Sequence, residues 1–305
     1  MKKKILALLL LFTLIFTGAS NVNASSASGN ADKATGKNGY IVFGDNLNAD
    51  QRKTVLNLLG VTEEELKDFN ILTVTNAEEH KYLDAFLDKE IIGKKALSSV
   101  KFIPREEGYG LSITTQNIDY CTVSMYKNAL ITAGVEDAEV IIAGPFEISG
   151  TAALIGVVKA YCEMEGKDID EEALKVATNE LVLTGQLGSY LGDQEKVAEF
   201  IAYAKQMVVA EGLESDEEIR KAVKEAAEEL DIELTEAQTD QVVELLKKIA
   251  KMDIDPEALA KQASDIYNAL QAMGIDLDSM DANSILDLIR KWLQEILDFL
   301  TNLFS

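Results

Sequence analysis

Histidine, cysteine and proline are scarce in this sequence, and their scarcity excludes several kinds of site. There are one histidine, two cysteines and three prolines among 305 residues. A zinc site with two histidine ligands is therefore excluded, and two cysteines cannot complete the common structural zinc sets. The sequence also lacks the GxGxxG stretch and the Lys-Ser/Thr loop that are typical of dinucleotide and nucleotide binding. It predicts no metal centre, no cofactor and no set of catalytic residues.

Basic residues are few compared with acidic ones. The chain has 29 Lys and Arg residues against 52 Asp and Glu residues. Such a surface repels polyanions, so nucleic acid is not an expected partner, and anionic lipid is repelled in the same way at low salt. Divalent cations would screen this repulsion, and loose Ca²⁺ or Mg²⁺ binding is one interpretation of the excess charge. The simpler interpretation is that the charge keeps the protein soluble.

The amino terminus has the three parts of a secretory signal peptide. Lysines at positions 2–4 precede an apolar stretch from Ile5 to Phe16, and small and polar residues follow as far as Ala24. We predict that residues 1–24 are a signal peptide cleaved after Ala24. The apolar stretch is shorter than the roughly 18 residues of a membrane span, so the mature chain should be secreted and extracellular, without a transmembrane segment. Its 26 basic residues (29 minus three) against 52 acidic ones give it a net charge of −26.

The next segments predict a linker and then an α/β domain. Residues 25–38 are small and polar without an apolar period, which is typical of a disordered linker. From residue 39 to residue 166, short apolar or β-branched runs alternate with helical stretches, which predicts an α/β domain. The expected strands are Tyr40–Phe43, Ile71–Thr75, Val100–Ile103, Leu111–Thr115 and Glu139–Ala143. The expected helices are Ala49–Leu59, Ala77–Leu87, Ile118–Ala133 and Thr151–Glu165.

Two halves of this α/β domain resemble each other in the order of their elements. The segment from Gly39 reads GYIVFG, then a helix ending in LLGV, then the strand ILTVT. The segment from Gly108 reads GYGLSITT, then a helix ending in ITAGV, then the strand EVIIAG. Internal duplication of a βαβα unit would explain this order, and chance similarity is the alternative.

Residues 167–305 are predicted to form an acidic, all-α domain. This part has 31 acidic and 13 basic residues, a net charge of −18. Its helices start with Asp, Ser or Thr followed by acids, where free N–H groups and the helix dipole favour negative charge. The last helix, Ser284–Phe304, is amphipathic, and Trp292, Phe299 and Phe304 on its apolar face are the expected contact with a partner or a membrane. Packing against the helical domain or into the groove of a partner is the alternative to membrane contact that we favour, because acids outnumber bases around this helix.

The single histidine, His80, is a formal candidate for a base beside a nucleophile. Thr75 with Glu78, or Asn76 with Glu79, makes a helix capping box that places His80 in the first or second turn of a helix. We therefore favour a structural role for this histidine.

Two further sets of residues are open to more than one interpretation. Export would permit a disulfide between Cys121 and Cys162, although we favour two free, buried thiols because both lie on expected helical segments. Ser149, Gly150 and Thr151 stand where a predicted strand leads into a helix, and a helix start of small residues can bind an anion. The alternative that we favour is that Ser149 caps the helix beneath tight helix–sheet packing.

Several stretches resemble a known family. TVTNAEEHKYL at positions 73–83, MYKNALITAGVEDAEVIIAGPFEISGTAALIGVVKAY at positions 125–161 and the aromatic tail are similar to the YpuA-like family of exported proteins from Gram-positive bacteria. GPFEISGTAAL is the most specific part. The family is a domain of unknown function, so the resemblance implies export and cell-envelope residence and supplies no catalytic residue.

These patterns predict a non-enzymatic, cell-envelope-associated binding or scaffold protein, with an envelope component or another protein as its partner. Two alternatives stay open. One is a secreted hydrolase of cell-wall material that uses two converging carboxylates, at least one with a raised pKa. The other is a peripheral membrane protein attached by the last helix.

Overall fold

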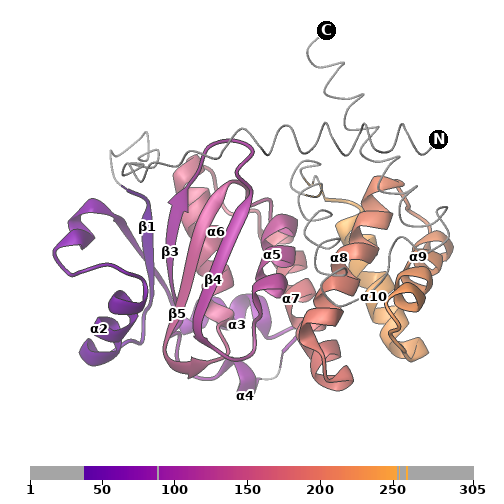
Figure 1. Ribbon diagram of the computed structural model, residues 1–305, viewed down its shortest axis with the longest axis horizontal. Helices are drawn as coiled ribbons and strands as arrows, with labels where there is room; N and C mark the ends of the chain where they lie inside the picture. The colour runs from indigo at the N-terminus through magenta and orange to yellow at the C-terminus, as the bar shows by residue number, and fades with distance from the viewer. Residues whose placement is uncertain (1–37, 88, 253, 255–258, 260–305) are drawn as a thin grey trace, which may run out of the picture.

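The computed structural model describes residues 38–87, 89–252, 254 and 259. The predicted signal peptide, the linker up to residue 37 and the amphipathic tail with Trp292, Phe299 and Phe304 lie outside the described residues. The described part is a mixed sheet with helices, followed by a helical region, which confirms the predicted α+β architecture. In Figure 1 the sheet lies on the left and α8 to α10 on the right, with α5 and α7 between them.

All five predicted strands are present, and they form one sheet. The strands are β1 (Tyr40–Gly44), β2 (Asn70–Val74), β3 (Ser99–Pro104), β4 (Leu111–Ile118) and β5 (Ala138–Ile148), in the spatial order β2-β1-β3-β5-β4. β1 pairs parallel with β2 and β4 pairs parallel with β5, while β3 is antiparallel to both of its neighbours. Four strands therefore run in the same direction and end at the same edge of the sheet, where β3 begins.

Helices cover both faces of the sheet. They are α2 (Ala49–Leu58), η2 (a 3-10 helix, Glu65–Asp68), α3 (Asn76–Leu83), α4 (Lys89–Ile92), α5 (Val123–Thr132) and α6 (Thr151–Glu165). The bounds of α6 are those predicted, whereas η2 and α4 were not expected. Val42 on one face of β1 packs against α6, whose Gly156 allows close approach because a Cβ there would lie 3.3 Å from the Val42 Cγ1 atom. Ile41 and Phe43 face the other way and pack against α2.

The two βαβα units expected from the sequence are present, but they are not copies of each other. The crossovers from β1 to β2 and from β4 to β5 both join parallel strands and step in the same direction along the sheet. α2 packs against Ile41 and Phe43 on one face, whereas α5 packs with Val140 and Ile142 on the face that α6 covers. The crossovers therefore have opposite handedness, and one of them is of the rare left-handed kind. Because no rotation interconverts the two hands, internal duplication does not explain this arrangement.

Long helices α7 (Glu171–Leu191), α8 (Gln194–Ala210), α9 (Asp216–Glu229) and α10 (Glu236–Ile249) make up the described helical region. The side chains of Asp170, Ser215 and Thr235 cap α7, α9 and α10, as the acidic starts predict. α8 is capped by Asp193, which the sequence pattern did not single out. The apolar faces of α8, α9 and α10 meet in one cluster that contains the fully buried Phe200.

α5, α7 and α8 enclose a buried ion pair. Lys205 Nζ on α8 lies 2.9 Å from Glu180 Oε1 on α7, and both side chains are 0% exposed. Thr132 on α5 donates its hydroxyl to Glu180 Oε2 over 2.5 Å, and Lys205 Nζ also donates to the carbonyl of Asn128 over 2.9 Å. Every strong polar group of this pair therefore has a partner, as burial of charge requires.

The helical region shares its core with the sheet region. The predicted boundary at residue 166 falls at Gly166, the left-handed residue that ends α6. Leu174, Ala177 and Leu181 of the next helix, α7, belong to the same buried cluster as Val42 and Phe102 of the sheet. The residues before and after this boundary therefore pack into one continuous core.

Candidate functional site

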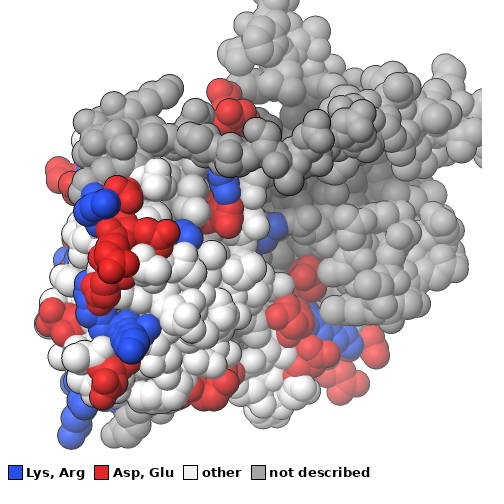
Figure 2. All heavy atoms as spheres, turned by 60° about the vertical axis from the view of Figure 1, so that its left-hand side comes forward, with Lys and Arg blue, Asp and Glu red and all other residues white. Residues whose placement is uncertain are grey.

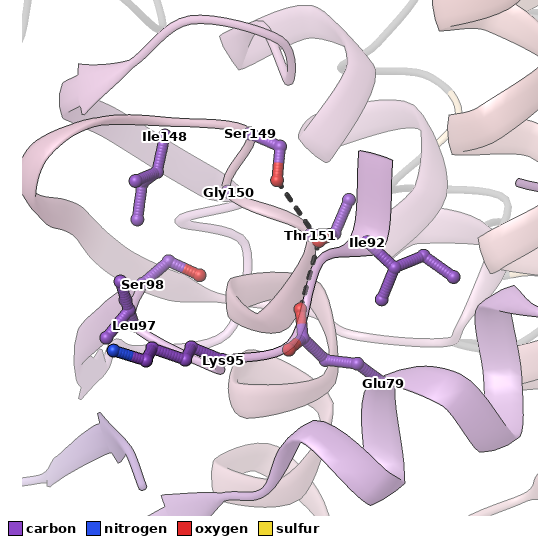
Figure 3. Close-up of a pocket in the computed structure, with 9 residues that line it drawn as sticks. All are labelled: Glu79, Ile92, Lys95, Leu97, Ser98, Ile148, Ser149, Gly150 and Thr151. Atoms are coloured by element: carbon purple, nitrogen blue, oxygen red, sulfur yellow. Dashed lines mark hydrogen bonds between the residues drawn. The ribbon is translucent and has the colours of Figure 1, made fainter. Parts of the chain in front are cut away.

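A cavity of about 180 Å³ lies at the edge of the sheet where the parallel strands end. Open α/β sheets bind ligands at this edge, because the connections that leave the strands form a crevice there. Figure 3 shows the side chains around the cavity, which come from α3, from α4 and the connection to β3, from the end of β5 and from the start of α6. The lining residues are Glu79, Ile92, Lys95, Leu97, Ser98, Ile148, Ser149, Gly150 and Thr151.

The connection before β3 is held firmly against the end of β1. Asn46 donates its backbone N–H to the Ala96 carbonyl over 3.1 Å, and its Oδ1 atom accepts from the Ala96 N–H over 2.9 Å. Gly44 permits this contact, because a Cβ there would lie 2.5 Å from the Ala96 carbonyl oxygen. The wall formed by Leu97 and Ser98 is therefore built on a rigid part of the fold.

α6 begins without a side-chain cap. Its N-cap is Gly150, at φ +86°, and not Ser149 as the sequence pattern favoured. Glycine is required because of this φ and because a Cβ would lie 2.3 Å from the Tyr126 hydroxyl, which donates to the Gly150 carbonyl over 2.6 Å. The Ser149 Oγ atom instead lies 3.4 Å from the Thr151 Oγ1 atom. The first N–H groups of α6 thus have no side-chain cap at the cavity wall.

Glu79 supplies a buried carboxyl group to the cavity. Its side chain is on α3, and the residue is 2% exposed. The Oε1 atom accepts from the Thr151 hydroxyl over 3.0 Å, and Oε2 accepts from the Asn76 side-chain amide over 3.2 Å. Burial raises the pKa of Glu79, because desolvation outweighs these two hydrogen bonds. A buried acid with a raised pKa in a cavity is a marker of functional sites.

Ser98 is the unusual polar group of the cavity. It is 4% exposed, yet its hydroxyl has no hydrogen-bond partner in the part of the chain that the structure describes. Figure 3 shows this hydroxyl pointing into the cavity, while the exposed Lys95 side chain runs along the rim. A ligand or a water molecule in the cavity can therefore supply the hydrogen-bond partner that this hydroxyl lacks among the described residues.

The sequence analysis predicted only the residues on one wall of this cavity. Ser149, Gly150 and Thr151 line the cavity, but Ser98 and Lys95 stand in an unpatterned connection, and Glu79 was considered only as part of a capping box. Glu79 is the single carboxylate among the nine lining residues. The second acid that the hydrolase hypothesis requires is therefore not supplied by the cavity wall.

Comparison with known proteins establishes the family. A family model described as "Protein of unknown function (DUF1002)" matches residues 43–266, which include every residue of the cavity. The chain belongs to the DUF1002 family. It is 39% identical over 226 residues to "Uncharacterized protein YpuA" of Bacillus subtilis (strain 168), a match that covers 74% of this chain and 76% of the relative. No solved structure matches. The resemblance to YpuA-like proteins is confirmed.

His80 of this DUF1002 protein is held outside the cavity by contacts on both ring nitrogens. Its Nδ1 atom lies 2.6 Å from Asp84 Oδ1, and its Nε2 atom lies 3.1 Å from the Gly93 carbonyl oxygen. It is in the second turn of α3, behind the predicted capping box of Thr75 and Glu78. The contact with Asp84 raises the pKa of the imidazole. These contacts favour a structural role, because neither nitrogen is available to activate a nucleophile.

We expect the His80 imidazole to titrate with a midpoint above 6.5, and the Asp84→Asn variant to lower that midpoint. The interaction stabilises the fold below the ordinary pKa of histidine and is lost as the pH rises through the raised pKa. Because the chain has one histidine, its ring signal in a ¹H–¹³C correlation spectrum follows this titration without overlap. Asp50→Asn on α2 is the control and should not move the midpoint. A wild-type midpoint at or below 6.5 would contradict the assignment.

The two cysteines do not form a disulfide in this DUF1002 structure. Cys121 and Cys162 are both buried and free. Burial raises the pKa of the Cys121 thiol to about 12, so this thiol is protonated and unreactive at neutral pH.

The described part of the DUF1002 chain carries few other signs of a binding surface. It contains no group of three or more metal-ligating side chains, and none of its helices has the length and apolar character of a membrane span. On the face shown in Figure 2, acidic and basic side chains lie beside each other around an uncharged area. That face therefore offers no continuous basic patch for a polyanion.

Proposed function

We propose that this protein is an exported, non-enzymatic binding protein of the cell envelope, and that the cavity at the edge of the sheet is its ligand site. The observation that carries the proposal is Ser98, a residue only 4% exposed, whose hydroxyl faces the cavity and lacks a partner among the described residues. A rigid wall and a few convergent polar groups beside apolar side chains are typical of small-ligand sites.

The chemistry of the cavity favours binding over catalysis. Glu79 is its single carboxylate, and among the described residues the Ser98 and Ser149 hydroxyls contact neither a histidine nor a second acid that would activate them. Hydrolysis by paired carboxylates needs two acids about 5–9.5 Å apart across the substrate. A site with one acid and several hydroxyl groups can orient a ligand without breaking a bond in it.

Export and envelope residence are supported by the first 24 residues, which have the charged, apolar and small-residue parts of a signal peptide. The acidic excess of the chain agrees with a protein that stays soluble between wall polymers. The amphipathic helix predicted for residues 284–304, with Trp292, Phe299 and Phe304, would provide a second contact, with a partner protein or with the envelope.

The test is cosedimentation of the mature protein with isolated cell-wall sacculi and with liposomes. We expect binding to sacculi that the Ser98→Ala variant reduces at least about tenfold, the cost of one hydrogen bond to a polar or charged ligand group. Ser112→Ala, on the exposed side of β4, is the matched control and should bind as the wild type does.

Two results would count against this proposal. Binding to sacculi that Ser98→Ala leaves unchanged would remove the cavity from the function. Binding to liposomes that disappears when residues 281–305 are deleted would favour peripheral membrane attachment instead.

A further inference from the structure

We propose that the cavity binds a small monocarboxylate, with the carboxylate group at the start of α6 and beside Ser98, and the apolar part of the ligand against Ile92, Leu97 and Ile148. This inference rests on the proposed function, because it names the ligand class of the same cavity.

Three groups favour a negative charge at this position. α6 begins at the cavity wall, where Gly150 and Thr151 line the cavity, and it has no side-chain cap, so the positive end of its dipole lies beside the cavity. Ser98 is buried and can donate its hydroxyl to the ligand. Lys95 on the rim adds a positive charge that has no ion-pair partner within the described ranges.

Glu79 limits the total charge that the cavity accepts. Its carboxyl lies against Thr151, so a fully ionised Glu79 would repel an anion at the start of α6. Burial raises its pKa, and Thr151 and Asn76 already donate hydrogen bonds to its two oxygens, so a monoanion beside it meets less repulsion than it would beside a bare carboxylate. A dianion such as hydrogen phosphate has twice the charge, so the Glu79 carboxyl would repel it more strongly. We therefore infer a carboxylate. A ligand amine would meet Lys95 and the positive end of α6, so a cation is disfavoured.

The size and the apolar wall narrow the ligand further. A volume of about 180 Å³ is several times the space that one water molecule needs, so the cavity admits a small organic ligand. A carboxylate with a short carbon chain fills such a space. Leu97 and Ile148 offer that chain an apolar surface on the side away from Glu79, and Ile92 lies on the side of Glu79, as Figure 3 shows.

The test uses three probes of nearly the same shape and different charge: sodium propionate, propionamide and propylammonium chloride, at constant ionic strength. Each is titrated into the mature wild-type protein while ¹H–¹⁵N spectra are recorded. We expect propionate to cause saturable shifts of the Ser98 and Thr151 amide signals, and the other two probes to cause none. Ser98→Ala should weaken propionate binding about tenfold or more, and the control Ser112→Ala should leave it unchanged.

The Glu79→Gln variant should change the affinity for an anionic ligand and for a cationic ligand in opposite directions. This variant keeps the shape of the side chain and removes its negative charge, so we expect propionate to bind as tightly as before or more tightly. A cationic ligand would instead bind more weakly. If Ser98→Ala alters the fold, as its spectrum would show, Ser149→Ala takes its place as the variant of the cavity wall.

The outcomes separate this inference from the proposed function. Saturable shifts with propylammonium or propionamide, or weaker propionate binding in Glu79→Gln, would overturn the carboxylate and leave the cavity as a ligand site. No response to any probe, together with Ser98-dependent binding to sacculi, would also overturn the carboxylate and keep the proposed function. Propionate binding without binding to sacculi would support the ligand class and count against the envelope role.

Discussion

Replacing Lys205 with methionine should lower the free energy of unfolding by about 3–5 kcal/mol. The substitution keeps the volume of the side chain but leaves the Glu180 carboxylate, which is 0% exposed, without its cation. Thr132 would remain as its hydrogen-bond donor, and one neutral hydroxyl cannot compensate a buried charge. Urea denaturation followed by far-ultraviolet circular dichroism measures the change.

Two companion variants show that the effect comes from an unpaired buried charge. Glu180→Met combined with Lys205→Met should recover most of the lost stability, because apolar side chains often replace a buried ion pair at little cost. Lys221→Met removes an ion pair whose lysine is 77% exposed, and its effect should stay within about 0.5 kcal/mol. A loss below about 1 kcal/mol for Lys205→Met alone would show that the pair is not held as described.

Phe102→Ala and Phe200→Ala should each cost about 3–5 kcal/mol, and each should shift the same unfolding transition. Phe102 on β3 is fully buried between the sheet and α6, and Phe200 on α8 is fully buried among the helices. The two regions share a core through Leu174, Ala177 and Leu181 of α7, so the loss of packing in one should destabilise the other. Calorimetry compared with circular dichroism measures whether one transition or two are present.

The control for these variants is Phe146→Ala, because Phe146 is 51% exposed at the end of β5. Its effect should stay within about 0.5 kcal/mol. Two transitions, one shifted by Phe102→Ala and the other by Phe200→Ala, would contradict the single transition. That result would instead support the two domains, 39–166 and 167–305, that the change in composition predicts.

Local signals predicted the elements well. The strand at Tyr40–Gly44 is a short apolar and β-branched run, and α6 follows an apolar period that ends at Gly166. Asp170, Ser215 and Thr235 cap their helices because their side-chain oxygens accept hydrogen bonds from first-turn N–H groups. The duplication was wrong because the order of elements does not record on which face of the sheet a connecting helix packs.

The residues of the site were harder to predict. Glu180 and Lys205, which lie outside the cavity, are 25 residues apart in the chain, and their pairing depends on how α7 and α8 pack. Ser98 stands in a connection without a pattern. Ser149 was expected to cap α6, and the hydrogen bond from Tyr126 to the Gly150 carbonyl shows why the cap is one residue later.

By itself the sequence determined the order of the five strands, the starts of α7, α9 and α10 and the absence of zinc and nucleotide motifs, because these depend on neighbours within a few residues. The tertiary structure decided the handedness of the two crossovers, the buried pair of Glu180 and Lys205, and the cavity where Glu79, Ser98 and Thr151 meet. The reason is physical: burial, desolvation and hydrogen-bond geometry depend on which distant segments pack together. In this chain the contact between Glu79 and Thr151 spans 72 residues.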